Sequence, residues 1–205
     1  MTAAEILALT LCAEAGHRPV RAIEALAALV VNRARLAAGD AAARARFAPA
    51  GGGAGWAGLV PAVCRAPFLF GCWNPRHPHR AALLAALRAA GPATDGRPAD
   101  PMLAACRRIA ARALGGGLPD LTAGATHWHD GAVVPGWAIG QIPTTEAGGL
   151  VFYRPPEQLA AGGGRTTLAP ALPPRRHPDT RNRANHLAVV ILAATMPGTT
   201  SASWS

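Results

Sequence analysis

The twenty residues Pro19 to Ala38, PVRAIEALAALVVNRARLAA, decide the fold of this chain. Five apolar residues of this run recur at the spacing of three and four that places side chains on one face of an α-helix. They are Ile23, Leu26, Ala27, Val30 and Ala34. Pro19 suits the first turn of such a helix, and Gly39 with Asp40 ends it. The run therefore predicts a long helix with one buried face.

Other helices are predicted on both sides of this run. Apolar periodicity with Gly or Pro at the ends predicts them at about residues 3–14, 79–90, 99–114 and 184–195, with a single turn at 60–64. Two segments are expected to be irregular: residues 48–58 are rich in Gly, and residues 66–78 are rich in aromatic side chains.

Two short strands are predicted near the end of this region, at residues 126–129 and 150–153. Pro135 and Pro143 confine them to edges and loops. Helices with one small β region predict a mostly α, α+β domain over residues 1–154. Residues 155–205 are expected to form a connection rich in Pro, Gly and Arg, followed by a C-terminal helix.

The composition fits a globular chain of 205 residues. Hydrophobic residues make up 50% and charged residues 15%, which leaves enough apolar side chain for a core. The longest apolar run, residues 184–196, is shorter than the ~20 residues that cross a bilayer, so we expect no stable membrane insertion. The net charge of +9 attracts polyanions. Arg without Lys is also typical of a GC-rich genome, and without a recognition motif we expect no nucleic-acid partner.

The four cysteines are Cys12, Cys64, Cys72 and Cys106, and none forms a C-x-x-C pair, so no structural zinc site is predicted. Cys64 and Cys72 flank a short segment. They would form a disulfide in an oxidising compartment, or stay as buried thiols. The start of the chain lacks the positive region of a signal peptide, which leaves the export route open.

Glu14 is expected at the end of an apolar helix, in Leu11-Cys12-Ala13-Glu14-Ala15-Gly16. A carboxyl group beside hydrophobic side chains loses solvation and holds its proton to higher pH. Such a group can donate the proton that cleavage of a glycosidic bond requires. A Glu at a helix end is more often a solvated surface residue, so this motif needs support from others.

A second motif, GATHWHD, covers residues 124–130. On a strand, His127 and His129 share one face, and Thr126, Trp128 and Asp130 share the other. A His-x-His pair either binds a metal or forms hydrogen bonds in a cleft, and no third ligand has an obvious spacing. Aromatic residues gather in this region and in residues 66–78, which favours a sugar-binding cleft because aromatic faces stack on sugar rings. They are Phe68, Phe70, Trp73, Trp128, Trp137, Phe152 and Tyr153.

Four motifs, taken in order over about residues 4–154, resemble those of the spore-cortex-lytic-type cell wall hydrolase family. Glu14-Ala15 with Pro19 and the helix ending Asn32-Arg33 is similar to its G-E-A-R-G-E-P and V-x-N-R elements. Val63-Cys64 and Phe70-Gly71-Cys72-Trp73-Asn74 resemble its Val-Cys and Q-F-S-x-W-N. Residues 124–129 resemble its G-A-T-H-Y-H, followed by Pro135 and Trp137. Residues 148–154 resemble its closing I-G-x-H-x-F-Y.

The resemblance implies a lysozyme-like fold and cleavage of peptidoglycan between N-acetylmuramic acid and N-acetylglucosamine, in the periplasm or cell wall, without a metal or cofactor. It implies Glu14 as the catalytic acid. The implied substrate-binding residues are Trp73, Asn74, Thr126, His127, Trp128, His129, Trp137 and Tyr153. Two positions depart from the family: its second Glu is Arg18 here, and the His of its closing block is Leu150.

A lytic transglycosylase needs one carboxylate, because the C6 hydroxyl of the muramic acid completes the reaction, whereas an ordinary hydrolase needs two. The candidate second carboxylates, Asp130, Glu24 and Glu146, have no compelling spacing, which favours the reaction with one Glu. Two alternatives stay open. One is a metal-dependent amidase that uses His127, His129 and a third ligand. The other is a non-catalytic wall-binding module that kept the cleft.

Overall fold

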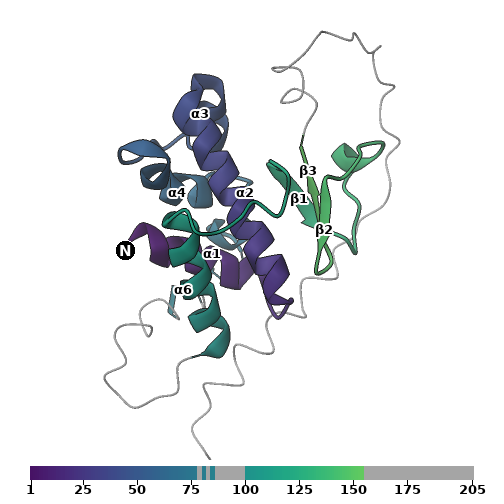
Figure 1. Ribbon diagram of the computed structural model, residues 1–205, viewed down its shortest axis with the longest axis horizontal. Coiled ribbons are helices and arrows are strands. Elements are labelled where there is room, and N and C mark those ends of the chain that lie inside the picture. The colour runs from purple at the N-terminus through teal and green to yellow at the C-terminus, as the bar shows by residue number, and fades with distance from the viewer. Residues whose placement is uncertain (78–79, 82–83, 86–99, 155–205) are drawn as a thin grey trace, which may run out of the picture. The chain divides into compact units, whose positions relative to one another are not determined.

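The computed structural model describes residues 1–77, 80–81, 84–85 and 100–154, and these form a mostly helical α+β structure (Figure 1). The α-helices are α1 (Ala3–Ala15), α2 (Val20–Gly39), α3 (Ala41–Phe47), α4 (Gly55–Arg65) and α6 (Pro101–Leu114). Two 3-10 helices are η1 (Gly71–Trp73) and η2 (Gly136–Ala138), and the strands are β1 (His127–Asp130), β2 (Thr145–Ala147) and β3 (Leu150–Tyr153). The predicted fold class is confirmed at this level.

Helix α1 is the buried centre of the helical part. A capping box starts it: the Glu5 N–H donates to Thr2 Oγ1, and the Thr2 N–H donates to Glu5 Oε2 at 2.7 Å. Buried side chains, all apolar except Thr10, then cover the helix from Ile6 to Leu11, and α2, α4 and α6 pack around it. Gly16 ends the helix at a φ of 56°, which L side chains rarely adopt. Glu14 is thereby fixed in the last turn of a buried helix.

Helix α2 agrees with the predicted bounds to within one residue, and its predicted apolar face is buried. Asp40 ends α2 and also caps α3, because its Oδ1 accepts the Ala43 N–H at 2.6 Å. Helix α3 was not predicted. Helix α4 begins at Gly55 rather than Val60, so the predicted Gly-rich loop is shorter and the predicted single turn is a helix of 11 residues.

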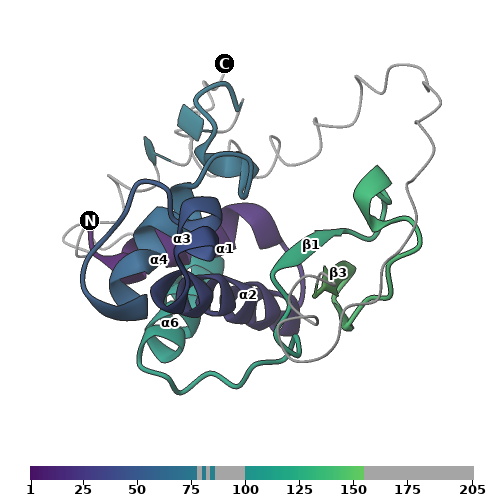
Figure 2. The same ribbon diagram turned by 90° about the horizontal axis from the view of Figure 1, so that it is seen from above.

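The three strands form an antiparallel sheet in the order β1-β3-β2, which lies beside α2 in both views (Figures 1 and 2). Trp128 of β1 pairs with Phe152 of β3, and Thr145 of β2 pairs with Phe152 from the other side. The turn between β2 and β3 packs on α2 at Gly148, where an added Cβ would lie 2.8 Å from the Ala22 Cβ. A glycine is therefore required where the sheet meets the helix.

Several expectations fall on residues that the structure does not describe. The helix expected at about 79–90 lies largely outside the described residues, and the connection and C-terminal helix expected in residues 155–205 lie wholly outside them. Among the described residues, no helix is long and apolar enough to span a membrane.

Candidate active site

Glu14 is half-buried in the last turn of α1 and faces η1. Its Oε1 accepts the backbone N–H of Cys72 at 2.9 Å. The Cys72 thiol also hydrogen-bonds the Glu14 carboxylate, and burial together with that carboxylate raises the pKa of the thiol. Cys72 therefore contacts the Glu14 carboxylate with both its backbone and its side chain, and these contacts fix the orientation of the carboxylate.

Trp73 is held on the same side of α1 as Glu14. Its Nε1–H donates to Thr10 Oγ1 at 2.8 Å, and Thr10 and Glu14 are four residues apart, one above the other on a helix. The Arg65 guanidinium lies 5.2 Å from the centre of the Trp73 ring. Asn74 is exposed, and its Oδ1 accepts the Arg76 N–H at 3.0 Å. The Trp73 side chain, which was predicted to bind substrate, is therefore held beside Glu14 by its hydrogen bond to Thr10.

Arg33 connects the surroundings of Glu14 with the sheet. Its side chain is buried, with 3% exposed, and its Nε–H donates to the Thr126 carbonyl at 2.7 Å. The guanidinium lies 5.1 Å from the Phe70 ring centre and 5.7 Å from that of Phe47. Burial lowers its pKa to about 9, and the nearby Glu14 carboxylate opposes this shift. Arg33 Nη1 is buried and has no hydrogen-bond partner among the described residues.

Asn32 ties α2 to the segment that leads into β1. Its Nδ2 lies 3.2 Å from Asp120 Oδ2, from Thr122 Oγ1 and from the Ala125 carbonyl. Neither Asn32 nor Arg33 was predicted to have a role of its own. The sequence feature that could have drawn attention to them is that both are polar residues in a helix that is otherwise mostly apolar.

One face of β1 carries an aromatic cluster, which we define as His127, His129, Trp137 and Tyr153. Trp137 is 47% exposed, and its ring centre lies 5.8 Å from each histidine ring and 5.3 Å from the Tyr153 ring. His129 stacks on Tyr153 at 5.5 Å, with Nε2 3.0 Å from the Tyr153 hydroxyl. The prediction that the two histidines share a face is confirmed.

The opposite face of β1 packs toward the helices. Trp128 stacks on Phe70 with 6.4 Å between ring centres, and it is only partly exposed. Thr126 is fully buried, and its Oγ1 lies 3.0 Å from His127 Nδ1. The structure therefore places Trp128 and Thr126 on the other face of β1 from the aromatic cluster. The Thr126 hydroxyl still contacts His127 of that cluster.

The ring nitrogens of the two histidines are all occupied. His127 Nε2 lies 2.9 Å from Arg46 Nη2, and burial with the charges of Arg33 and Arg46 lowers the His127 pKa to about 4. His129 Nδ1 lies 2.8 Å from the Asp130 carbonyl. Within the described ranges, no three His, Cys, Asp or Glu side chains are placed to hold a metal ion. The guanidinium beside His127 also disfavours a cation there.

Two of the three candidate second carboxylates are engaged in ion pairs. Asp130 pairs with Arg18 at 2.5 Å, and Glu24 pairs with Arg112 at 2.9 Å. Although burial opposes ionisation, the Ala132 N–H and the Arg18 guanidinium hold the pKa of Asp130 below its ordinary value. Arg18, at the position where the resembled motif has a second Glu, pairs with a carboxylate instead of supplying one.

The other position that departs from the resembled motifs lies in the core. Leu150 is fully buried in β3, where an apolar side chain needs no hydrogen-bond partner. Glu146, the third candidate carboxylate, is exposed on β2.

Cys64 and Cys72 are free thiols rather than a disulfide. Cys64 is buried beside Thr10, and burial raises its pKa to about 12. Cys72 contacts Glu14 as described above. Of the two alternatives that the spacing left open, the structure therefore has the buried thiols.

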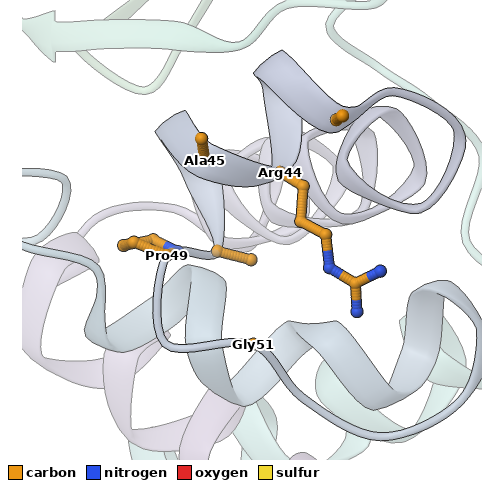
Figure 3. A pocket seen from close by; sticks show the side chains of 6 residues that line it. Arg44, Ala45, Pro49 and Gly51 are labelled. Carbon is orange, nitrogen blue, oxygen red and sulfur yellow. The ribbon is translucent and has the colours of Figure 1, made fainter.

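A hollow beside α3 lies apart from these residues (Figure 3). Its lining consists of Ala41, Arg44, Ala45, Ala48, Pro49 and Gly51. None of them belongs to the predicted site, and Arg44 is the single charged side chain among the six.

Neither a family model, nor a curated protein, nor a solved structure matches this chain. The family resemblance is therefore still a prediction that rests on the four motifs.

Proposed function

We propose that this chain is a glycosidase that cleaves peptidoglycan between N-acetylmuramic acid and N-acetylglucosamine, as a lytic transglycosylase on a lysozyme-like fold. The observation that carries the proposal is the setting of Glu14: a half-buried carboxylate in the last turn of a buried helix, with one oxygen held by the Cys72 N–H. A general acid needs this fixed orientation toward the bond that it protonates.

The proposed reaction uses Glu14 twice. Oε1 accepts the Cys72 N–H, which orients the carboxyl group that exchanges the proton. Glu14 first protonates the glycosidic oxygen, and an oxocarbenium-like centre forms at C1 of the muramic acid. The ionised Glu14 then takes the proton of the C6 hydroxyl as that oxygen attacks C1, which gives a 1,6-anhydro product and restores the acid.

The ion pairs of two of the three candidate second carboxylates favour this reaction over hydrolysis. A hydrolase of the usual kind needs a second carboxylate as nucleophile or base. Asp130 and Glu24 are each held by an arginine. The aromatic cluster around Trp137 supplies ring faces that suit sugar rings, and we assign it to substrate binding.

The test is mass spectrometry of the soluble products that the full chain releases from purified peptidoglycan. Wild type, Glu14→Gln and the control Glu146→Gln are compared, and the control removes an exposed carboxylate of the same type. We expect anhydro-muropeptides from wild type and Glu146→Gln, and none from Glu14→Gln. Reducing-end products would mean a hydrolase, free stem peptides an amidase, and no products a binding module; each of these results overturns the proposal.

A further inference from the structure

Two guanidinium groups lie beside one phenylalanine ring, next to the aromatic cluster. The guanidinium carbon of Arg46 lies 5.4 Å from the centre of the Phe47 ring, and that of Arg33 lies 5.7 Å from it. The same ring meets His127 edge to face, with 6.4 Å between ring centres. Two positive charges are therefore close to one member of the aromatic cluster.

Arg33 is the buried charge of the two. Its Nε–H donates to the Thr126 carbonyl, and its buried Nη1 has no hydrogen-bond partner in the part of the chain that the structure describes. A carbonyl oxygen satisfies a donor but does not neutralise its charge, and the carboxylate whose charge favours the ionised Arg33 is that of Glu14. A buried cation of this kind makes the potential at the nearby surface more positive and favours an anion there.

Arg46 is the exposed charge of the two, and His127 holds it in place. Arg46 Nη2 lies 2.9 Å from His127 Nε2, and His127 Nδ1 lies 3.0 Å from Thr126 Oγ1. Because arginine can only donate, the imidazole accepts at Nε2 and carries its proton on Nδ1. Burial and the charges of both arginines lower the pKa of His127 to about 4, so this neutral form persists at neutral pH. The contact uses one of the five N–H groups of the guanidinium.

We propose that Arg46 binds a carboxylate of the glycan strand beside the sugar ring that the aromatic cluster contacts, an inference that rests on the proposed function. Arg46 and Trp137 are neighbours of the same imidazole, Arg46 through Nε2 and Trp137 with 5.8 Å between ring centres. A ligand that joins a sugar ring to an acidic substituent can therefore reach both side chains. The planar fork of a guanidinium matches the two oxygens of a carboxylate.

The proposal narrows the substrate class to acidic glycans. The carboxylate is either the free lactyl group of muramic acid or part of a peptide attached to that group, whereas a glycan of N-acetylglucosamine alone is neutral. Arg46 would thus prefer a strand that contains muramic acid, and the aromatic cluster alone would bind either kind of strand.

The test uses the full chain with Glu14→Gln, so that binding is measured without turnover, and three soluble oligomers of equal sugar length. One is an oligomer of N-acetylglucosamine, one alternates N-acetylglucosamine with muramic acid that has free lactyl carboxylates, and one is the alternating oligomer with attached peptides. Calorimetry gives each dissociation constant at low salt and at about 0.5 M salt. We expect an acidic oligomer to bind about 5-fold more tightly than the neutral one at low salt, and the added salt to remove most of this difference. A preference for the peptide-free oligomer would identify the lactyl carboxylate, and a preference for the other would identify a peptide carboxylate.

The variants are made in the same Glu14→Gln background. Arg46→Gln should bind all three oligomers as weakly as its parent binds the neutral one, while Arg46→Lys keeps the charge and should keep most of the preference. The matched control is Arg44→Gln, which removes an exposed arginine of the same helix whose side chain lines the hollow of Figure 3, and it should behave like the parent.

A preference that survives Arg46→Gln would overturn this inference, and so would equal binding of the neutral and acidic oligomers by the parent. Either result would leave the proposed function standing if wild type still releases anhydro-muropeptides. Binding of none of the three oligomers would overturn the glycan recognition that the proposed function needs, and this inference with it.

Discussion

The helical region, residues 1–77 with α6, and the sheet region, residues 119–154, handle polar groups in opposite ways. In the helical region one carboxylate, Glu14, is half-buried among apolar side chains and held by a backbone N–H. In the sheet region the candidate carboxylate Asp130 is more exposed and paired with Arg18. The sheet region instead presents rings, those of the aromatic cluster. Under the proposed function, this difference would place the proton transfer in the helical region and the sugar recognition in the sheet region.

The largest effect that this comparison predicts is at Glu14. Glu14→Gln keeps the shape and the Cys72 hydrogen bond but cannot donate a proton as an acid. We expect product release to fall about 10³-fold, with the melting temperature unchanged within about 2 °C. Rates of release of soluble muropeptides and a thermal melt measure the two quantities. A Glu14→Gln protein with a tenth or more of the wild-type rate would place the acid elsewhere.

The next largest effect is a loss of stability at Asn32, whose side chain connects the helical region to the sheet region. Asn32→Asp replaces a donor by a carboxylate 3.2 Å from Asp120 Oδ2, the Thr122 hydroxyl and the Ala125 carbonyl. Repulsion and lost hydrogen bonds should lower the free energy of unfolding by about 2–3 kcal/mol, as measured by urea unfolding. The matched control Asn74→Asp, at an exposed Asn, should lower it by less than about 0.5 kcal/mol. Equal losses would show that Asn32 does not join the regions.

A substitution at Trp137 tests whether the aromatic cluster of the sheet region binds the substrate. Trp137→Ala removes the half-exposed ring that contacts both histidines and Tyr153. We expect binding to insoluble peptidoglycan to weaken about 5-fold, since one aromatic face contributes about 1 kcal/mol. Co-sedimentation in a Glu14→Gln background measures binding without turnover. Ile142→Ala, which shortens an exposed side chain in the same connection, is the control and should bind as before. Unchanged binding in Trp137→Ala would remove the cluster from the substrate site.

The buried part of the sheet region predicts a pH effect through His127. Its folded pKa of about 4 lies below the ordinary 6.5, so the unfolded chain binds a proton first as the pH falls. The stabilisation is complete above pH 6.5 and is lost toward pH 4. Allowing for partial exposure, we expect about 1 kcal/mol between pH 7 and pH 4.5. Urea unfolding should show a smaller loss over this range in His127→Gln than in wild type. Parallel curves would mean that His127 is not held neutral by the fold.

What the sequence could predict was local. Helices α1, α2 and α6 and strand β3 follow from periodicity and end signals within each segment. Helix α3 was missed because Asp40 is the end signal of one helix and the cap of the next. Strand β2 was missed because its three residues are a strand through pairing with β3. In the site, Glu14 stood out as a carboxylate at the end of an apolar helix.

The pairings around Glu14 were not predictable by spacing. Arg33 contacts Thr126 across 93 positions, and Arg18 contacts Asp130 across 112. Sequence patterns of one helix or strand carry no record of such partners. The Cys64–Cys72 suggestion shows the same limit, because the two residues flank a short segment and yet both are buried free thiols.

The smallest expected effect is that of Arg18→Ala. This variant tests whether the ion pair with Arg18 prevents Asp130 from taking part in the reaction. Arg18→Ala releases Asp130 from an ion pair whose side chains are 25% and 51% exposed, so the free energy of unfolding should change by less than 1 kcal/mol. If one Glu carries the reaction, the products stay anhydro-muropeptides, because the C6 hydroxyl still supplies the nucleophile. If Asp130 can activate water once Arg18 is gone, reducing-end products appear beside them. That result would mean that the two regions share the chemistry and that Arg18, standing where the family has a Glu, suppresses hydrolysis.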